Sequence, residues 1–198
     1  MNKNKKLSDL IQPEFYIFDL EWTAWPDSNE NNWSAPGEYR EIVEIGAIKI
    51  IRHKNMLVID EEFSCLVLPC INKQLSKYFI NLTGIHQSEL DEKGLNFQKA
   101  LDLFCSFINL DKRIYSFGSD FSVIEENIKL HNSKTIIDEK AFFDFRPIIC
   151  SAFNLNLHVC SSELPKETGI SADYDKHRAL GDVYAQFAVL RNYLEQTI

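Results

Sequence analysis

Hydrophobic and polar positions follow a strand-like pattern in the first third of the 198-residue chain. Three segments there are rich in β-branched and aromatic residues and alternate at least in part, which is typical of strands. Two shorter apolar segments further along are each broken by polar residues and also predict strands. The five predicted strands are 15–21, 41–51, 56–67, 113–117 and 141–145.

Helical spacing dominates the second half of the chain. The clearest pattern lies in 96–108, where Phe97, Leu101 and Phe104 recur on one face. Further helices are predicted at 75–80, 82–91 (a turn and then a short helix starting near Ser88), 121–131, 147–155, 161–168 and from about 178 to 195. Three strands followed by helix, strand, helix, strand and helix predict an α/β fold, with a mixed sheet flanked by helices.

The chain length fits one domain with a sizeable core. Residues 1–13 are interpreted as a polar lead-in, and 14–198 as a single domain. A turn is predicted at 52–55. The polar segment 26–40 contains Pro, Gly and Asn and is long enough to suggest a loop that covers a site.

Composition narrows the possible functions. The hydrophobic fraction of 45% and fourteen phenylalanines indicate a packed globular protein. A formal charge of −8 argues against a protein that binds long nucleic acid through its net charge alone. It does not exclude a small acidic site whose charge is neutralised by metal ions. The N-terminal segment has no apolar core of a signal peptide, and no run of 18 apolar residues exists. A cytoplasmic protein without a membrane segment is therefore expected.

The five cysteines are odd in number and scattered, and no CxxC motif occurs. Their spacing argues against a zinc site or a disulfide framework, and reduced thiols are the simplest interpretation.

Two carboxylates stand out at the end of the first predicted strand. Asp19 and Glu21 are two positions apart, so a strand places them on the same face. They would repel each other there and lose hydration in an apolar setting. Either they lie at an exposed strand end, or they bind a metal ion, since hard divalent cations such as Mg²⁺ take carboxylate oxygens.

Candidate partners for this pair occur later in the chain, and each has a simpler alternative role. Asp120 follows a predicted strand and stands at the start of a predicted helix. The simpler alternative is that Asp120 or Ser119 caps this helix. Asp182 lies in the first turns of the C-terminal helix, with His177 five residues earlier. Five residues turn a helix by about 500°, so His177 must reach the same site from the preceding loop or first turn. A solvated helix start with an incidental histidine is the alternative.

The whole set resembles the DEDD superfamily of 3′→5′ exonucleases, in the branch with a histidine (DEDDh). The resemblance rests on DLE at Asp19–Glu21, on GSD ending at Asp120, and on HRALGD from His177 to Asp182. These motifs occur in the family's order over residues 15–190. IVEIGAIKI and LTGI further resemble the Eri-1/three-prime histone exonuclease type. The resemblance implies a ribonuclease H-like fold with a mixed five-stranded sheet, three antiparallel strands followed by two parallel ones.

It also implies hydrolysis of phosphodiester bonds with two divalent metal ions, Mg²⁺ or Mn²⁺, and release of nucleoside 5′-monophosphates. By the resemblance, Asp19 bridges the two ions, and Glu21 and Asp182 hold the first. Asp120 acts on the second through water. His177 serves as general base, for which its ordinary pKa near 6.5 is suited.

Substrate contacts are expected from five residues. The backbone of Leu20 approaches the terminal sugar. Trp22 stands where family members often have a smaller residue, so Thr23 takes the neighbouring role one position later. Thr83 and Ile85 belong to the turn that resembles the family's contact with the terminal nucleotide. Ile85 and Phe121 would wedge against bases, with ordinary core packing as the alternative.

The expected activity is removal of nucleotides from the 3′ end of single-stranded RNA or DNA, with no obligate protein partner. A proofreading subunit that works only inside a polymerase complex is less favoured than a stand-alone enzyme, and two other hypotheses remain. One is a catalytically silent regulatory protein of the same fold, which the complete acid set disfavours. The other is an oligoribonuclease-like enzyme for very short RNA, which would require a dimer.

Overall fold

A five-stranded sheet forms the centre of the computed structural model, which describes residues 11–54, 56–171 and 174–196. Within these residues the strand order is β3–β2–β1–β4–β5. β1 pairs antiparallel with β2, as β2 does with β3, whereas β4 runs parallel to β1 and to β5. The strands are β1 (Glu14–Trp22), β2 (Ile42–His53), β3 (Met56–Leu66), β4 (Arg113–Ser116) and β5 (Phe142–Asp144). The predicted mixed sheet, with three antiparallel and then two parallel strands, is confirmed.

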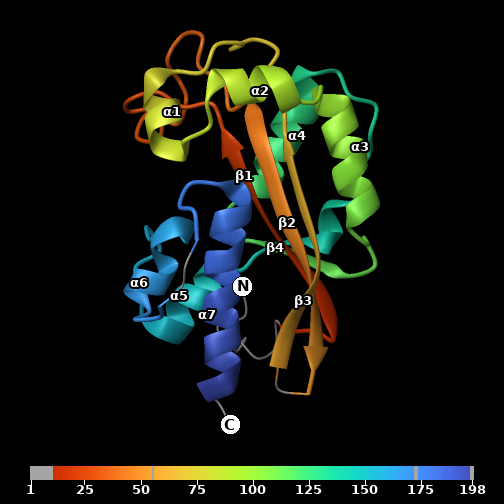
Figure 1. Ribbon diagram of the computed structural model, residues 1–198, viewed down its shortest axis with the longest axis vertical. Helices are drawn as coiled ribbons and strands as arrows, with labels where there is room; N and C mark the ends of the chain where they lie inside the picture. The colour runs from red at the N-terminus through yellow and green to blue at the C-terminus, as the bar shows by residue number, and fades with distance from the viewer. Residues whose placement is uncertain (1–10, 55, 172–173, 197–198) are drawn as a thin grey trace.

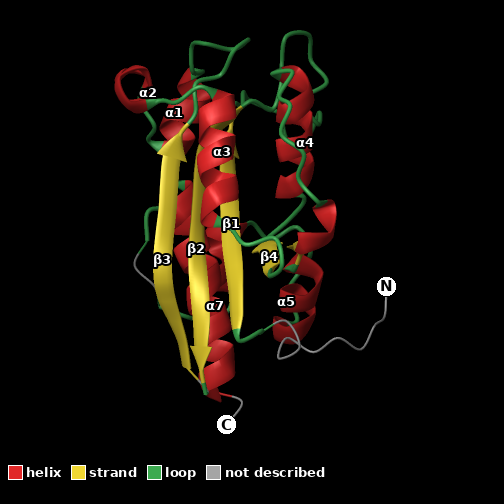
Figure 2. Cartoon of the chain, turned by 90° about the vertical axis from the view of Figure 1, so that its right-hand side faces the viewer, coloured by secondary structure: helices red, strands yellow, loops and turns green. Residues whose placement is uncertain are grey.

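Helices flank this sheet on both faces and at one end (Figures 1 and 2). They are α1 (Lys77–Thr83), α2 (Gln87–Lys93), α3 (Phe97–Phe107), α4 (Asp120–Leu130), α5 (Arg146–Phe153), α6 (Leu164–Glu167) and α7 (Ala179–Gln196), with 3₁₀ turns at Glu139–Ala141 and Ser161–Glu163. No helix among the described residues is both long and apolar enough to cross a membrane.

Element boundaries differ from the predicted ones where capping decides them. α1 begins after Ser76, whose side chain accepts the backbone N–H of Phe79, and it ends at Gly84 with a φ of 70°. α2 begins at Gln87, one residue before Ser88, so the predicted start of this helix near Ser88 is confirmed; its N-cap residue, His86, makes no side-chain cap bond. Of the predicted lead-in, only 11–13 falls within the described residues, and Asn55 of the predicted turn lies outside them.

Alternation along β1 separates two hydrophobic cores. Phe15 and Ile17 face α7 and pack with residues of α5 and α7. Phe18 and Leu20 face the opposite way and pack with α3 and α4, where the ring of Phe18 lies 5.5 Å from that of Phe104. Asp19 and Glu21 continue the series of the α7 face, so the predicted shared face of the two acids is confirmed.

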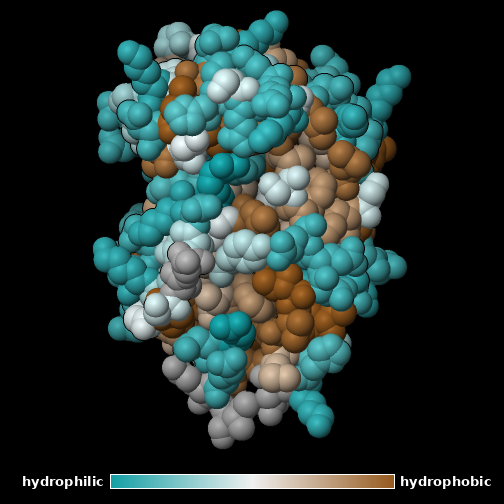
Figure 3. All heavy atoms as spheres, viewed as in Figure 1, coloured by the Kyte–Doolittle hydropathy of each residue, from teal (hydrophilic) through white to brown (hydrophobic). Residues whose placement is uncertain are grey.

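The surface is uneven in polarity. In the view of Figure 3, hydrophilic residues dominate the end formed by α1 and α2, and hydrophobic residues gather beside α7 over the β2–β3 hairpin. Met56 and Val58 of β3 are exposed.

Gly46 lets the start of α7 approach the sheet. It lies opposite Asp19 in the β1–β2 pairing. A Cβ at this position would lie 2.3 Å from the backbone nitrogen of Leu180 and 2.5 Å from the carbonyl carbon of Ala179. Since both are backbone atoms, no side-chain rotation relieves the clash, and only a residue without a Cβ allows α7 to begin next to β1.

We therefore expect Gly46→Ala to destabilise the protein by about 1–3 kcal/mol or more, because the helix start must shift away from the sheet. Thermal unfolding measures the effect. Ser64→Ala is a matched control, because Ser64 pairs with Gly46 on β3 and is exposed. Equal melting temperatures for the two variants would contradict this account of Gly46.

Candidate functional site

Four carboxylates converge where β1 and β4 end. Asp19 and Glu21 lie on β1, and Asp120 is the first residue of α4, which follows β4. Asp182 lies in the first turn of α7. Because β1 and β4 are parallel, their carboxyl ends meet at one edge of the sheet, and Gly46 brings the start of α7 to the same place.

Asp19 occupies the centre of this group. Its side chain is buried, and burial raises its pKa well above the ordinary value, with further increases from the charges of Asp120, Asp182 and Glu21. The side-chain amide of Gln186 on α7 donates a hydrogen bond of 3.1 Å to Asp19 Oδ1. The other amide atom, Gln186 Oε1, is buried without a hydrogen-bond partner in the described residues.

Glu21 lies opposite Glu44 of β2, so the strand pairing sets two carboxylates side by side. Burial is again the largest cause of the raised pKa of Glu21, followed by the charges of Asp182 and Glu44. Arg178 neutralises Glu44: its guanidinium Nη2 lies 2.7 Å from Glu44 Oε1, and its Nε contacts both carboxylate oxygens. The backbone N–H of Ala179 also donates to Glu44. These bonds fix the entry to α7 on the sheet.

His177 reaches the site from the segment before α7. Its φ of 57° is left-handed, an uncommon conformation for a residue with a side chain. Its backbone N–H donates to Asp182 Oδ1 at 3.2 Å. One ligand atom each of Glu21, His177 and Asp182 lies within 4.8 Å of the others. The prediction that His177 approaches from the loop is therefore confirmed in geometry.

Asp120 and Asp182 share one electrostatic feature. Burial raises the pKa of each to about 6. Hydrogen bonds oppose the shift: Ser161 Oγ donates to Asp182 Oδ2 at 3.0 Å, and Ser116 and the N–H of Asp120 itself lower the pKa of Asp120. Ser119, the residue before α4, forms no side-chain cap, so it does not fill the capping role considered for it.

The five predicted substrate contacts occupy different environments. Leu20 and Ile85 have buried side chains in two of the hydrophobic cores. Phe121 stacks on Phe142 at 4.3 Å between ring centroids. Thr23 donates to the carbonyl of Tyr39, and Thr83 to that of Phe79, so both hydroxyls serve the local backbone. Contact of any of the five with a substrate remains a prediction.

A groove of about 450 Å³ is lined by Lys176 and Arg178, the two sequence neighbours of His177. Thr83 and Gly84 also line it. Both cations are already paired, Lys176 with Glu163 at 2.8 Å and Arg178 with Glu44. The groove is therefore lined by cations that are partly neutralised by neighbouring carboxylates.

Three residues of the site escaped sequence reasoning. Glu44 had a visible signal, because a carboxylate inside an apolar strand requires a buried partner. Gln186 and Ser161 had none, since a single polar residue on a helix or loop does not indicate what it contacts.

Sequence comparisons relate most of this chain to known exonucleases. The exonuclease family model RNase_T matches residues 16–190. Human ERI1 exoribonuclease 2 is 31% identical over 108 residues, which is 54% of this chain and 14% of that protein. The Drosophila melanogaster 3′-5′ exonuclease Snipper is 31% identical over 115 residues, 56% of this chain and 37% of that protein. The chain thus spans well under half the length of these curated relatives.

Solved structures agree on the fold. The nuclease domain of 3′hExo, a DEDDh family member bound to rAMP, has a TM-score of 0.75 at 22% identity, covering 93% of this chain and 92% of that one. A zinc-bound complex of Escherichia coli ExoI with single-stranded DNA has a TM-score of 0.64 at 18% identity, covering 93% and 43%. Because the family model matches residues 16–190, nearly the whole chain, the chain belongs to the RNase_T family of exonucleases.

Proposed function

We propose that the chain is a metal-dependent 3′→5′ exonuclease acting on single-stranded RNA or DNA. One observation carries the proposal: four carboxylates from β1, α4 and α7 converge with His177, whose two sequence neighbours line a groove. Structural neighbours of the same fold include a 3′-exonuclease that recognises a histone mRNA stem-loop and ExoI bound to an oligonucleotide.

The residues fit divalent metal ions. Clustered carboxylates with raised pKa values are costly without cations, and their oxygens are the ligands that Mg²⁺ and Mn²⁺ prefer. The unpartnered Gln186 Oε1 adds an acceptor beside Asp19. Asp19, Glu21, Asp120 and Asp182 would hold two such ions. When bound, they would activate water and stabilise charge on the phosphate.

The protein side chains divide the remaining work. His177 would accept the proton of the attacking water, and burial lowers the pKa of His177, so its neutral, proton-accepting form persists to lower pH. The Asp182 carboxylate accepts the backbone N–H of His177, and the Gln186 amide donates to Asp19. Two side chains of α7 therefore orient His177 and Asp19. Thr83 and Gly84 would contact the terminal nucleotide where they line the groove.

A degradation ladder tests the proposal. The protein is incubated with 5′-labelled single-stranded RNA and DNA of one sequence in Mg²⁺, Mn²⁺ or EDTA. We expect metal-dependent shortening from the 3′ end with nucleoside 5′-monophosphate products. Activity confined to dinucleotides, together with a dimer in gel filtration, would instead support the oligoribonuclease-like hypothesis. No cleavage under any condition would favour a silent regulatory protein.

The acids also predict how stability depends on pH. The folded-state pKa values of Asp120 and Asp182 are about 6, above their unfolded values near 3.9. A raised carboxyl pKa contributes stability below about pH 4 that is lost as the pH rises through 6. In EDTA, we expect this loss to lower the melting temperature between about pH 4 and 7, and Mn²⁺ to restore it at neutral pH.

Thermal unfolding across this range checks the expectation, with Asp182→Asn as the comparison. The variant cannot lose a proton at that position, so its pH dependence in EDTA should be flatter. Identical profiles for both proteins, or no shift on adding Mn²⁺ to the unsubstituted chain, would count against a metal-binding acid cluster.

A further inference from the structure

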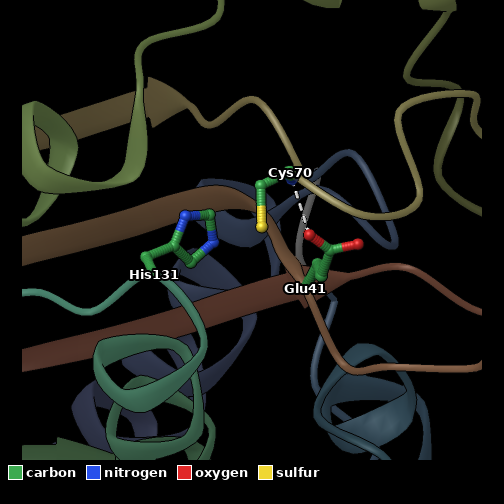
Figure 4. Close-up of side chains that lie close together, drawn as sticks. All are labelled: Glu41, Cys70 and His131. Atoms are coloured by element: carbon green, nitrogen blue, oxygen red, sulfur yellow. Dashed lines mark hydrogen bonds between the residues drawn. The ribbon is translucent and has the colours of Figure 1, made fainter.

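A second cluster of metal-binding side chains lies apart from the four carboxylates. Glu41 precedes β2, Cys70 lies between β3 and α1, and His131 follows α4. One ligand atom of each lies within 4.8 Å of the others. Figure 4 shows the Cys70 sulfur between the imidazole of His131 and the carboxylate of Glu41. None of the three belongs to the catalytic site proposed above.

Two of these side chains are held in place by the fold. Glu41 is fully buried, and its carboxylate accepts backbone N–H groups from Cys70 at 2.6 Å, Ile71 at 2.8 Å and Asn72 at 2.5 Å. The ring of His131 stacks on Phe97 with centroids 4.6 Å apart. Within the described residues, its imidazole nitrogens form no hydrogen bond. The Glu41 carboxylate is therefore held in place, and the His131 imidazole has no hydrogen bond within the described residues. Both lie close to the sulfur of Cys70.

Cys70 gives this cluster access to solvent. Cys70 is exposed, so a metal ion can reach the three side chains without any opening of the hydrophobic core. Asn72, on the same connection, has a buried side-chain oxygen with no hydrogen-bond partner in the described part of the chain. Among the residues described, this oxygen is an unused acceptor on the connection that carries Cys70.

We propose that Glu41, Cys70 and His131 bind a zinc ion. A thiolate, an imidazole and a carboxylate form a ligand set suited to Zn²⁺, whereas Mg²⁺ and Mn²⁺ prefer oxygen ligands alone. A tetrahedral zinc ion with bonds of about 2.0–2.3 Å holds its ligand atoms roughly 3.3–3.8 Å apart, so atoms that lie within 4.8 Å of one another need movements of about 1 Å to converge on it. Three protein ligands leave the fourth position to water.

The position of the cluster suggests what the ion would do. It would join three segments that are far apart in sequence, at the connection leading from β3 into α1. That connection is also held by Asn72 Nδ2 donating to the carbonyl of Gly37 and by Ser76 Oγ donating to that of Ala24. Because α1 ends at Thr83 on the groove, zinc would stabilise one wall of the groove without entering it.

Cobalt binding tests the site, because Co²⁺ substitutes for zinc and shows a thiolate-to-metal absorption band only when a cysteine is bound. The full chain is reduced, freed of metal by a chelator, and titrated with Co²⁺ in excess Mn²⁺ to occupy the carboxylates. We expect the band to saturate at one equivalent per chain and to disappear on adding Zn²⁺.

Three variants assign the ligands. Cys70→Ser should lose the band entirely, and His131→Gln should weaken cobalt binding at least about tenfold. Cys160→Ser, at another exposed cysteine, should behave like the unsubstituted chain. Absence of the band, or its persistence in Cys70→Ser, would show that the cluster is only a hydrogen-bonded contact between loops. The readout does not depend on nuclease activity, so it remains informative if the proposed exonuclease function fails.

Discussion

Replacing Asp19 with asparagine is expected to reduce exonuclease activity by about a thousandfold or more. Asp19 is central to the four carboxylates, and both metal ions would depend on its charge. Losing several kcal/mol of charge stabilisation in the transition state corresponds to about three powers of ten in rate. The ladder assay on the preferred polymer measures this effect.

The same substitution should stabilise the metal-free protein. The introduced amide would keep an oxygen able to accept the hydrogen bond from Gln186, while repulsion with Asp120, Asp182 and Glu21 is removed. In EDTA at neutral pH we expect a higher melting temperature than that of the unsubstituted chain, by about 2–4 °C for each kcal/mol gained. Adding Mn²⁺ should reverse the order. Loss of both activity and metal-free stability would instead indicate that Asp19 is needed for folding.

Replacing His177 with asparagine should lower activity by about 10²–10⁴-fold, the usual contribution of a general base. Asparagine is chosen because it tolerates the left-handed backbone that His177 adopts, with its φ of 57°, and keeps the N–H that Asp182 accepts. Rates are measured at saturating Mg²⁺, with a melting curve to confirm the fold.

The pH profile separates a catalytic from a structural role for His177. The unsubstituted enzyme should lose activity as the histidine becomes protonated, at a pH below the ordinary value because burial lowers its pKa. The variant should lack this step. Lys166→Ala serves as the control, since Lys166 is another exposed partner of Glu163 and does not line the groove. If His177→Asn retained the rate and acid limb of the unsubstituted enzyme, the proposed base would be wrong.

The sequence by itself determined the order of elements and the shared face of the two β1 acids. Strand alternation is local, so Phe15, Ile17, Asp19 and Glu21 had to point the same way once 14–22 formed a strand. The order of the motifs also identified Asp120, Asp182 and His177 as candidate site residues. Their convergence depends on β4 running parallel to β1, which the family resemblance implies and which the structure confirms.

Only the tertiary structure decided what surrounds these groups. The pairing of Glu44 with Arg178 spans 134 positions, and the contact of Gln186 with Asp19 spans 167. The cluster of Glu41, Cys70 and His131 lacks any local cysteine spacing that a zinc motif would show. Periodicity reports which face a residue occupies, because that depends on its neighbours along the chain. Which side chain it meets depends on how distant segments pack, and no local pattern carries that information.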